Sequence, residues 1–240
     1  MKIYTLNKDA GVLMIAFEKL PPEFRHPSVR PYYDILQKKQ LSRVVKRVFD
    51  LVVSLIALVF LIIPIAVIAV AVRLDSKGPV LFRQERVTTY GKRFKINKFR
   101  TMVVNAEALG TQVTTNADSR VTKTGRFLRK YRLDELPQIF NVIGGSMSFV
   151  GTRPEVPRYV ERYEPEYYAT LLLPAGITSL ASIRYKDEEK LLSEASNADE
   201  TYVRKVLPEK MKYNLAYTRD FGFFSDMKLM IQTVFEVAGS

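Results

Sequence analysis

The sequence contains no cysteine and a single histidine among its 240 residues. Disulfides, thiolate nucleophiles and cysteine-bound metals are therefore excluded. A serine–histidine triad would have to use His26, which lies in a proline-rich stretch. Catalysis by this chain must therefore use carboxylates, hydroxyls or amines. Any metal ion should be a hard, oxygen-ligated cation such as Mg²⁺.

Several common catalytic motifs are also missing. The chain has no P-loop, no GxGxxG fingerprint, no HExxH motif and no Asp-x-Asp pair of the kind that many nucleotide-sugar glycosyltransferases use to hold a metal. Positive charge, in contrast, is abundant, because 37 lysines and arginines outnumber 25 acidic residues and give a formal charge of +12. This surplus predicts an anionic partner: nucleic acid, phosphorylated small molecules or lipid headgroups.

A 22-residue run from Leu51 to Val72 contains no charged side chain. About 20 apolar residues suffice to cross a bilayer as a helix. Basic residues flank both ends of the run, and such charges favour the cytoplasmic side of a membrane. Pro64, past the middle, can kink a helix. The residues alone leave two alternatives open: a helix that bends near Pro64 and returns to the same face, or an ordinary single-pass helix.

The membrane segment divides the chain. We expect an N-terminal extension at residues 1–40 without an assigned function, a membrane region at 41–77 and a cytosolic catalytic domain at 78–240. The N-terminal region lacks a secretory signal, which favours a cytosolic location for the active portion. Lipid headgroups account for part of the positive charge. Because no nucleic-acid-binding motif is present, we expect no nucleic-acid partner.

The segments after the membrane run predict a mainly helical α+β fold. Val80–Val87 and Lys92–Met102 carry β-branched and aromatic residues around a turn at Gly91, which predicts a small β-hairpin. Ser148–Pro154 reads as a tight Gly/Pro turn holding an arginine. The Tyr- and Arg-rich stretch after Pro157 suits interfacial amphipathic helices; partly buried tyrosines on a domain surface are the alternative.

Three Asp-Glu dipeptides are candidates for carboxylate chemistry: Asp134-Glu135, Asp187-Glu188 and Asp199-Glu200. The second lies in a charge run that we expect to be a solvated face. The first follows four basic residues, and Pro137 fits the first turn of a helix, so Asp134 should lie at a helix start. A carboxylate among arginines should have a lowered pKa and could attack phosphorus. The alternative is a helix N-cap with surface ion pairs.

Several long motifs follow one another between about residue 43 and the end of the chain. They are KRVFDLVVS at 46–54, GPVLFRQERV at 78–87, KFRTM at 98–102, DSRVTKTGRFLRKYRLDELPQIFNVIGGSMSFVGTRPE at 118–155, PAGIT at 174–178 and DETYV at 199–203. With these motifs in this order the chain resembles the bacterial sugar transferases, the monotopic phosphoglycosyl transferases.

The resemblance implies a re-entrant membrane helix broken at Pro64, in the bacterial inner membrane with the active domain on the cytosolic face. It implies transfer of a sugar 1-phosphate from a UDP-sugar to undecaprenyl phosphate, giving a polyprenyl-diphosphate sugar and UMP, as the first membrane step of a surface glycan. Asp134 would be the nucleophile and the ligand of Mg²⁺, and Glu135 would assist it. The remaining implied residues are the phosphate contacts Lys98, Arg100, Arg129 and Arg153, and the polar site residue Asp199.

Two questions stay open at this stage. A non-catalytic, membrane-bound scaffold of a glycan assembly complex is the rival interpretation, and a homo-oligomer is compatible with either. The family pattern GITGLAQ appears here as GITSLAS at residues 176–182. This departure falls in a region that we associate with substrate contacts, so the sugar is not predicted.

Overall fold

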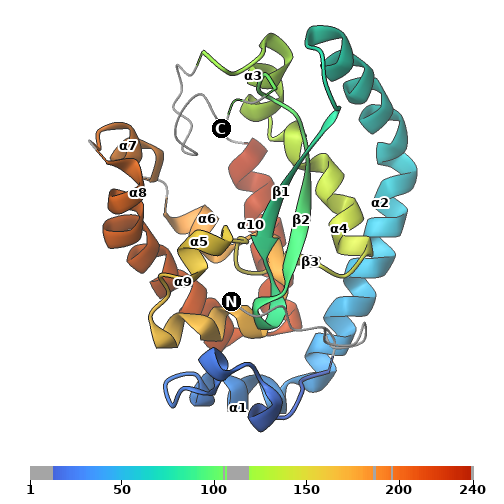
Figure 1. The fold of residues 1–240 in the computed structure, drawn as a ribbon. Coiled ribbons are helices and arrows are strands. Elements are labelled where there is room, and N and C mark those ends of the chain that lie inside the picture. Colours follow the sequence, from blue (N-terminus) through green and yellow to red (C-terminus); the bar gives the residue numbers. More distant parts are fainter. Residues whose placement is uncertain (1–12, 105, 107–118, 186–187, 196, 239–240) are drawn as a thin grey trace.

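The structure is a computed structural model that describes residues 13–104, 106, 119–185, 188–195 and 197–238. This part of the chain is mainly helical, with two small two-stranded sheets, as expected. In Figure 1, α2 forms one edge of the molecule and α7 and α8 lie at the opposite edge, with the β1–β2 hairpin between them. The helices are α1 (Arg30–Lys38), α2 (Gln40–Asp75), α3 (Lys123–Lys130), α4 (Ile139–Ile143), α5 (Pro157–Val160), α6 (Leu180–Arg184), α7 (Glu188–Ser193), α8 (Ala198–Thr201), α9 (Leu207–Asp220) and α10 (Phe223–Ala238); the strands are β1 (Leu81–Val87), β2 (Arg93–Phe99), β3 (Met147–Val150) and β4 (Ala175–Thr178).

The predicted hairpin is confirmed. Strands β1 and β2 pair in antiparallel fashion, with Leu81 opposite Phe99 and Val87 opposite Arg93. The connecting turn needs a left-handed backbone at Tyr90 (φ 56°) and Gly91 (φ 75°). Glycine adopts this conformation without a steric penalty, which explains the glycine at the second position.

A second, parallel pair of strands was not predicted. Strand β3 occupies the first residues of the stretch expected to be a Gly/Pro turn, so that expectation is wrong up to Val150. Strand β4 lies so close that a Cβ on Gly176 would come within 2.1 Å of the Gly151 backbone nitrogen. Glycine is required at this contact because the two backbones leave no room for a side chain.

Helix α2 contains the apolar run and is continuous through Pro64. It is long and apolar enough to cross a membrane, and only 6% of its most apolar window is buried. The re-entrant break at Pro64 therefore stays a prediction.

Both ends of α2 are attached to the same folded domain. Near its start, Arg47 donates hydrogen bonds to the carbonyl oxygens of Val142 (2.7 Å) and Ile143 (2.9 Å) at the end of α4. Asp50, which is buried, accepts a hydrogen bond of 2.7 Å from the hydroxyl of Ser148 in β3. Near its end, Val72 is buried in an apolar cluster with residues of β2 and α3.

The segment before α2 also belongs to the main core. Phe24, Tyr33 and Leu36 are buried together with Leu172 and Phe221 from the second half of the chain. The proposed boundary at residue 40 stays a prediction, but the described residues before it pack closely against the rest.

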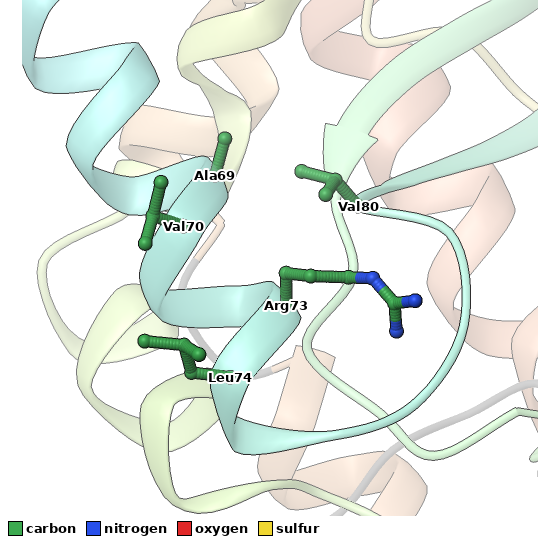
Figure 2. A pocket seen from close by; sticks show the side chains of 5 residues that line it. All are labelled: Ala69, Val70, Arg73, Leu74 and Val80. Atoms are coloured by element: carbon green, nitrogen blue, oxygen red, sulfur yellow. The ribbon is translucent and has the colours of Figure 1, made fainter.

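A shallow apolar groove of about 270 Å³ lies between the last turns of α2 and the start of β1 (Figure 2). Its lining residues are Ala69, Val70, Arg73, Leu74 and Val80.

Candidate active site

The Asp134-Glu135 pair lies in a short 3-10 helix, Leu133–Gln138. Arg132, with φ of 53°, turns the chain into this helix from α3, and Pro137 lies inside it. The pair is in its first turn, which confirms that Asp134 lies at a helix start. The helix packs against β2, so the strand that carries Lys98 lies beside the pair.

Glu135 is the centre of a partly buried ion triad. Its Oε1 accepts hydrogen bonds from Lys98 Nζ (2.8 Å) and Arg153 Nη2 (2.6 Å), and its side chain is only 13% exposed. Burial by itself would raise the pKa of this carboxyl, but the charges of Arg153 and Lys98 outweigh burial and hold the pKa of Glu135 well below its usual range. Glu135 is therefore ionised throughout the physiological pH range.

Asp134 has the opposite electrostatic character. Burial raises its pKa, Lys98 and Arg129 oppose the increase, and the negative charge of Glu135 adds to it. The expected lowered pKa of Asp134 is therefore wrong, because burial and the neighbouring carboxylate outweigh the basic residues. Among the described residues, no side-chain donor forms a hydrogen bond to its carboxylate, so Asp134 is not part of the ion triad.

The predicted phosphate-binding residues divide into two groups. Lys98 and Arg153 contact Glu135 directly, and Arg129, whose Nε donates to the hydroxyl of Thr101 (2.9 Å), acts electrostatically on Asp134. Arg100 lies at the end of α2 instead, where its Nη2 donates to the carbonyl oxygen of Ser76 (2.7 Å).

Asp199 lies in α8, and its Oδ1 accepts hydrogen bonds from Arg158 Nη2 (2.6 Å) and the hydroxyl of Tyr159 (2.8 Å). Tyr159 is stacked on Tyr202 with their ring centroids 4.3 Å apart. Both tyrosines are buried, which agrees with the partly buried alternative for this Tyr-rich region.

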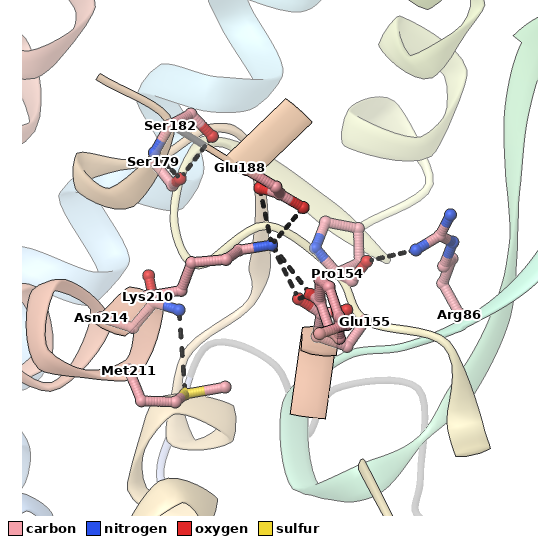
Figure 3. Close-up of polar contacts among 10 residues, drawn as sticks. Arg86, Pro154, Glu155, Ser179, Ser182, Glu188, Lys210, Met211 and Asn214 are labelled. Atoms are coloured by element: carbon pink, nitrogen blue, oxygen red, sulfur yellow. Dashed lines mark hydrogen bonds and ion pairs between the residues drawn. The ribbon is translucent and has the colours of Figure 1, made fainter. Parts of the chain in front are cut away.

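A second buried cluster, which the sequence analysis missed, surrounds Glu155 (Figure 3). Its Oε1 accepts hydrogen bonds from the Tyr202 hydroxyl (2.5 Å) and from Lys210 Nζ (3.1 Å) in α9. Burial would raise the pKa of Glu155, but Lys210, Tyr202 and Arg86 hold it below its usual value. The signal that could have revealed this cluster is an acidic residue directly after the Arg153-Pro154 turn.

The Glu155 cluster fixes the position of the turn that carries Arg153. Arg86 Nη1 donates to the carbonyl oxygen of Pro154 (3.0 Å), and the backbone N–H of Val87 donates to the carbonyl oxygen of Glu155 (3.0 Å). Strand β1 and helix α9 therefore hold this turn from two sides, and Arg153 is placed against Glu135.

Two local expectations change in this region. Glu188 was expected on a solvated face, but its carboxylate lies 3.4 Å from the buried ammonium of Lys210. Ser179, where the family pattern has glycine, accepts a hydrogen bond of 3.0 Å from the backbone N–H of Ser182 and thereby caps α6. That substitution therefore stabilises a helix start.

The acid pair is better suited to Mg²⁺, which can also bind waters and substrate phosphates, than to a metal ion whose ligands are all protein side chains. Among the described residues there is no group of three or more acidic or histidine side chains that could enclose an ion. Mg²⁺ usually keeps several waters and binds one or two carboxylates together with substrate phosphates. Asp134, with no side-chain donor on its carboxylate within the described part, fits such a site.

A partly buried acid pair among cations, next to a helix apolar enough for a membrane, defines a candidate site for phosphorylated substrates at a membrane surface. Sequence comparison assigns the family: the model of the bacterial sugar transferases matches residues 41–240, and the chain belongs to that family.

Curated relatives act on more than one sugar. A UDP-glucose:undecaprenyl-phosphate glucose-1-phosphate transferase from Klebsiella pneumoniae is 38% identical over 82% of this chain and 40% of its own length. A Caulobacter vibrioides protein of the same name is 34% identical over 79% of this chain and 68% of its own length. A UDP-N-acetylgalactosamine-undecaprenyl-phosphate N-acetylgalactosaminephosphotransferase from Aeromonas hydrophila is 33% identical over 79% of this chain and 43% of its own length. The chain spans about two fifths of the length of the first of these relatives.

Proposed function

We propose that this protein is a phosphoglycosyl transferase that moves a sugar 1-phosphate from a UDP-sugar to undecaprenyl phosphate. The observation that carries the proposal is the electrostatic division of the acid pair. Glu135 forms ion pairs with Lys98 and Arg153, whereas the carboxylate of Asp134 accepts no side-chain hydrogen bond from the described residues. Glu135 thus has a structural role in the ion triad, and Asp134 is the carboxylate that we propose reacts.

The proposed reaction has two displacements at one phosphorus atom. A carboxylate oxygen of Asp134 attacks the phosphorus that bears the sugar, and the bond from this phosphorus to the bridging oxygen breaks, so that UMP leaves with that oxygen. A phosphate oxygen of the acceptor lipid then attacks the same phosphorus, and the bond to Asp134 breaks. The carboxylate is regenerated, and the product is a polyprenyl-diphosphate sugar.

The cations of the site have separate roles in this scheme. Lys98 and Arg153 orient Glu135, which keeps negative charge beside Asp134, and Arg129 offers positive charge to the diphosphate. Mg²⁺, bound to Asp134 and the substrate phosphates, would neutralise charge on the transferring group.

We further propose that α2 enters the cytoplasmic face of the inner membrane and returns to it. The contacts of both helix ends with one domain support this arrangement, since a spanning helix would place its ends on opposite faces. The chain lacks cysteine, so single cysteines can be introduced at Leu41 and Leu74, which are 77% and 81% exposed. In intact cells a membrane-impermeant maleimide should label neither site, and should label both after lysis. Labelling of one site from outside would contradict the re-entrant arrangement.

The reaction is tested by UMP release from protein in nanodiscs, with undecaprenyl phosphate, Mg²⁺ and a panel of UDP-sugars. The panel should include glucose and N-acetylgalactosamine, because the names of the relatives carry both. Wild type should turn over with one sugar, and Asp134→Asn should not, although it remains membrane-bound. Equal behaviour of the two proteins would favour the scaffold alternative. A sugar identified in this way would support a role in the first membrane step of a surface glycan.

A further inference from the structure

An open pocket of about 400 Å³ lies between the segment that precedes α1 and the Tyr-rich region. One wall belongs to residues 22–27 and the other to residues 163–168. The first wall precedes residue 41, where the match with the family model begins. None of the lining residues belongs to the ion triad of Glu135, so the pocket is separate from the candidate active site.

The walls of this pocket are rigid. Three of the lining residues are prolines, whose rings fix the backbone: Pro22, Pro27 and Pro165. Behind the first wall, Phe24 is 2% exposed and packs edge-on against Tyr168, with ring centroids 5.4 Å apart. Tyr168 packs in the same way against Tyr163, at 5.7 Å. Because these groups are already held in place, a ligand would pay little to order them.

The first wall also carries three polar side chains, Glu23, Arg25 and His26. Glu23 and Arg25 are exposed, and neither forms an ion pair or a side-chain hydrogen bond within the described part of the chain. The Nδ1 of His26 accepts a hydrogen bond of 3.3 Å from the backbone N–H of Ser28, so in the neutral ring the proton is on Nε2. The pocket thus offers an acceptor at Glu23 and donors at Arg25 and His26.

This combination of side chains favours a neutral ligand with several hydroxyl groups. A phosphate would be attracted by Arg25 and repelled by Glu23, and for a cation the two effects are reversed. A hydroxyl group both donates and accepts, so a sugar satisfies the two side chains together. The C–H bonds of a pyranose ring pack on tyrosine, because the face of the aromatic ring is negative. An apolar wall with a few polar groups, in a pocket of this size, is typical of small-molecule sites.

From these observations we propose that the pocket between residues 22–27 and 163–168 is a carbohydrate-binding site for a neutral pyranose. The sugar ring packs against Tyr163 and Tyr168, and its hydroxyl groups bind Glu23 and Arg25. A free monosaccharide and the terminal unit of a glycan share this chemistry. The proposal does not depend on the proposed reaction, because no lining residue has a role in that reaction.

Two arginines provide a matched test. Arg25 lines the pocket, whereas Arg162, which is also exposed, does not line it. Arg25→Gln and Arg162→Gln both change an exposed side chain, so both variants should fold as wild type does, which circular dichroism checks. The proteins are studied in nanodiscs, because detergents with sugar headgroups would compete for the site.

Binding is measured by saturation-transfer NMR with methyl glucoside, methyl N-acetylgalactosaminide and a glucose tetrasaccharide as probes. Wild type should transfer magnetisation to the ring C–H protons of a pyranose, with a Kd in the millimolar range that is usual for a ligand of monosaccharide size. Excess UDP should not displace the sugar. Arg25→Gln should raise the Kd about tenfold, the factor expected for the loss of one hydrogen bond to a charged group, and Arg162→Gln should leave it unchanged. Tighter binding of the tetrasaccharide than of both methyl glycosides would identify a glycan as the ligand, and equal binding would identify the free sugar.

Several results would overturn the carbohydrate site. These are the absence of transfer to every probe, an equal Kd in Arg25→Gln and Arg162→Gln, and displacement of the sugar by UDP, which would assign the signal to a nucleotide site. Binding of a proline-rich peptide in place of any sugar would assign the pocket to a protein partner and would also overturn it, because aromatic grooves bind such peptides. None of these results bears on the proposed reaction, since the assay contains neither a UDP-sugar nor an acceptor lipid.

Discussion

Substitution of Lys210 tests whether its ion pair with Glu155 stabilises the turn that carries Arg153. Its ammonium is buried, with its side chain 8% exposed, and it contacts the Glu155 carboxylate at 3.1 Å and the Tyr202 hydroxyl at 2.9 Å. Lys210→Met would leave a buried carboxylate without its main countercharge, which costs about 3–5 kcal/mol for a buried pair. Because Tyr202 and Arg86 still support Glu155, we expect the lower end, about 3 kcal/mol.

Lys212 is the matched control. It lies in the same helix, but its ion pair with Glu209 is exposed, at 68% and 46% of the two side chains. Such pairs contribute about 0–1 kcal/mol, so Lys212→Met should change stability little. In the double variant Glu155→Gln/Lys210→Met both charges are absent, and a coupling of at least about 1 kcal/mol should recover part of the loss.

The pH dependence provides an independent check. Because the folded pKa of Glu155 is lowered, its stabilising contribution is present above the unfolded pKa of glutamate, about 4.3, and is lost as the pH falls through the folded value. In Lys210→Met the pKa of Glu155 should rise, so the cost should be largest at neutral pH and should shrink in acid as the carboxyl is protonated.

The assay is urea unfolding in detergent micelles, followed by circular dichroism at neutral and acidic pH. Equal unfolding free energies for Lys210→Met and Lys212→Met would refute the structural argument. A difference between wild type and Lys210→Met that is independent of pH would also contradict it, because the electrostatic contribution would then be absent.

Three further predictions concern the acid pair and its support. Turnover should fall as the pH decreases through the raised pKa of Asp134. Glu135→Gln removes a neighbouring negative charge, so a pH–rate profile of this variant should show the fall in turnover at a lower pH than in wild type. Glu135→Gln should also reduce kcat about 100-fold, because Lys98 and Arg153 lose the carboxylate that orders them, and an unchanged kcat would contradict the role of the triad. Gly125→Ala would place its Cβ 2.1 Å from the Thr101 carbonyl oxygen and should lower the melting temperature, whereas Gly222→Ala, with 3.6 Å to its nearest atom, should have little effect.

The sequence was most informative where patterns are local. The uncharged run predicted the long helix α2, and the alternating residues around Gly91 predicted the hairpin almost to its ends. The family motifs predicted Lys98, Arg129 and Arg153 as site residues, and in the structure all three act electrostatically on Asp134 or Glu135.

What escaped prediction depends on partners that are distant in the chain. Strand β3 is four residues long and pairs with β4 across a crossover, so no local alternation marks it. The pKa of Asp134 followed burial, which the neighbouring basic residues in the sequence do not indicate. Glu155 and Lys210 are 55 positions apart, and only the fold shows that each neutralises the other.

The attachment of α2 at both ends has a mechanical consequence. Arg47 donates hydrogen bonds to the end of α4, and the buried Val72 packs against residues of β2 and α3, so both ends of the helix are fixed to the domain by contacts. In a bilayer, the distance of Asp134 from the membrane plane would then be set by the protein and would not vary with fluctuations of a flexible linker. If Asp134 acts as proposed, lipids whose phosphates lie at another height, for instance in a thicker bilayer, would meet its carboxylate less often, so bilayer thickness would affect the rate of the proposed transfer.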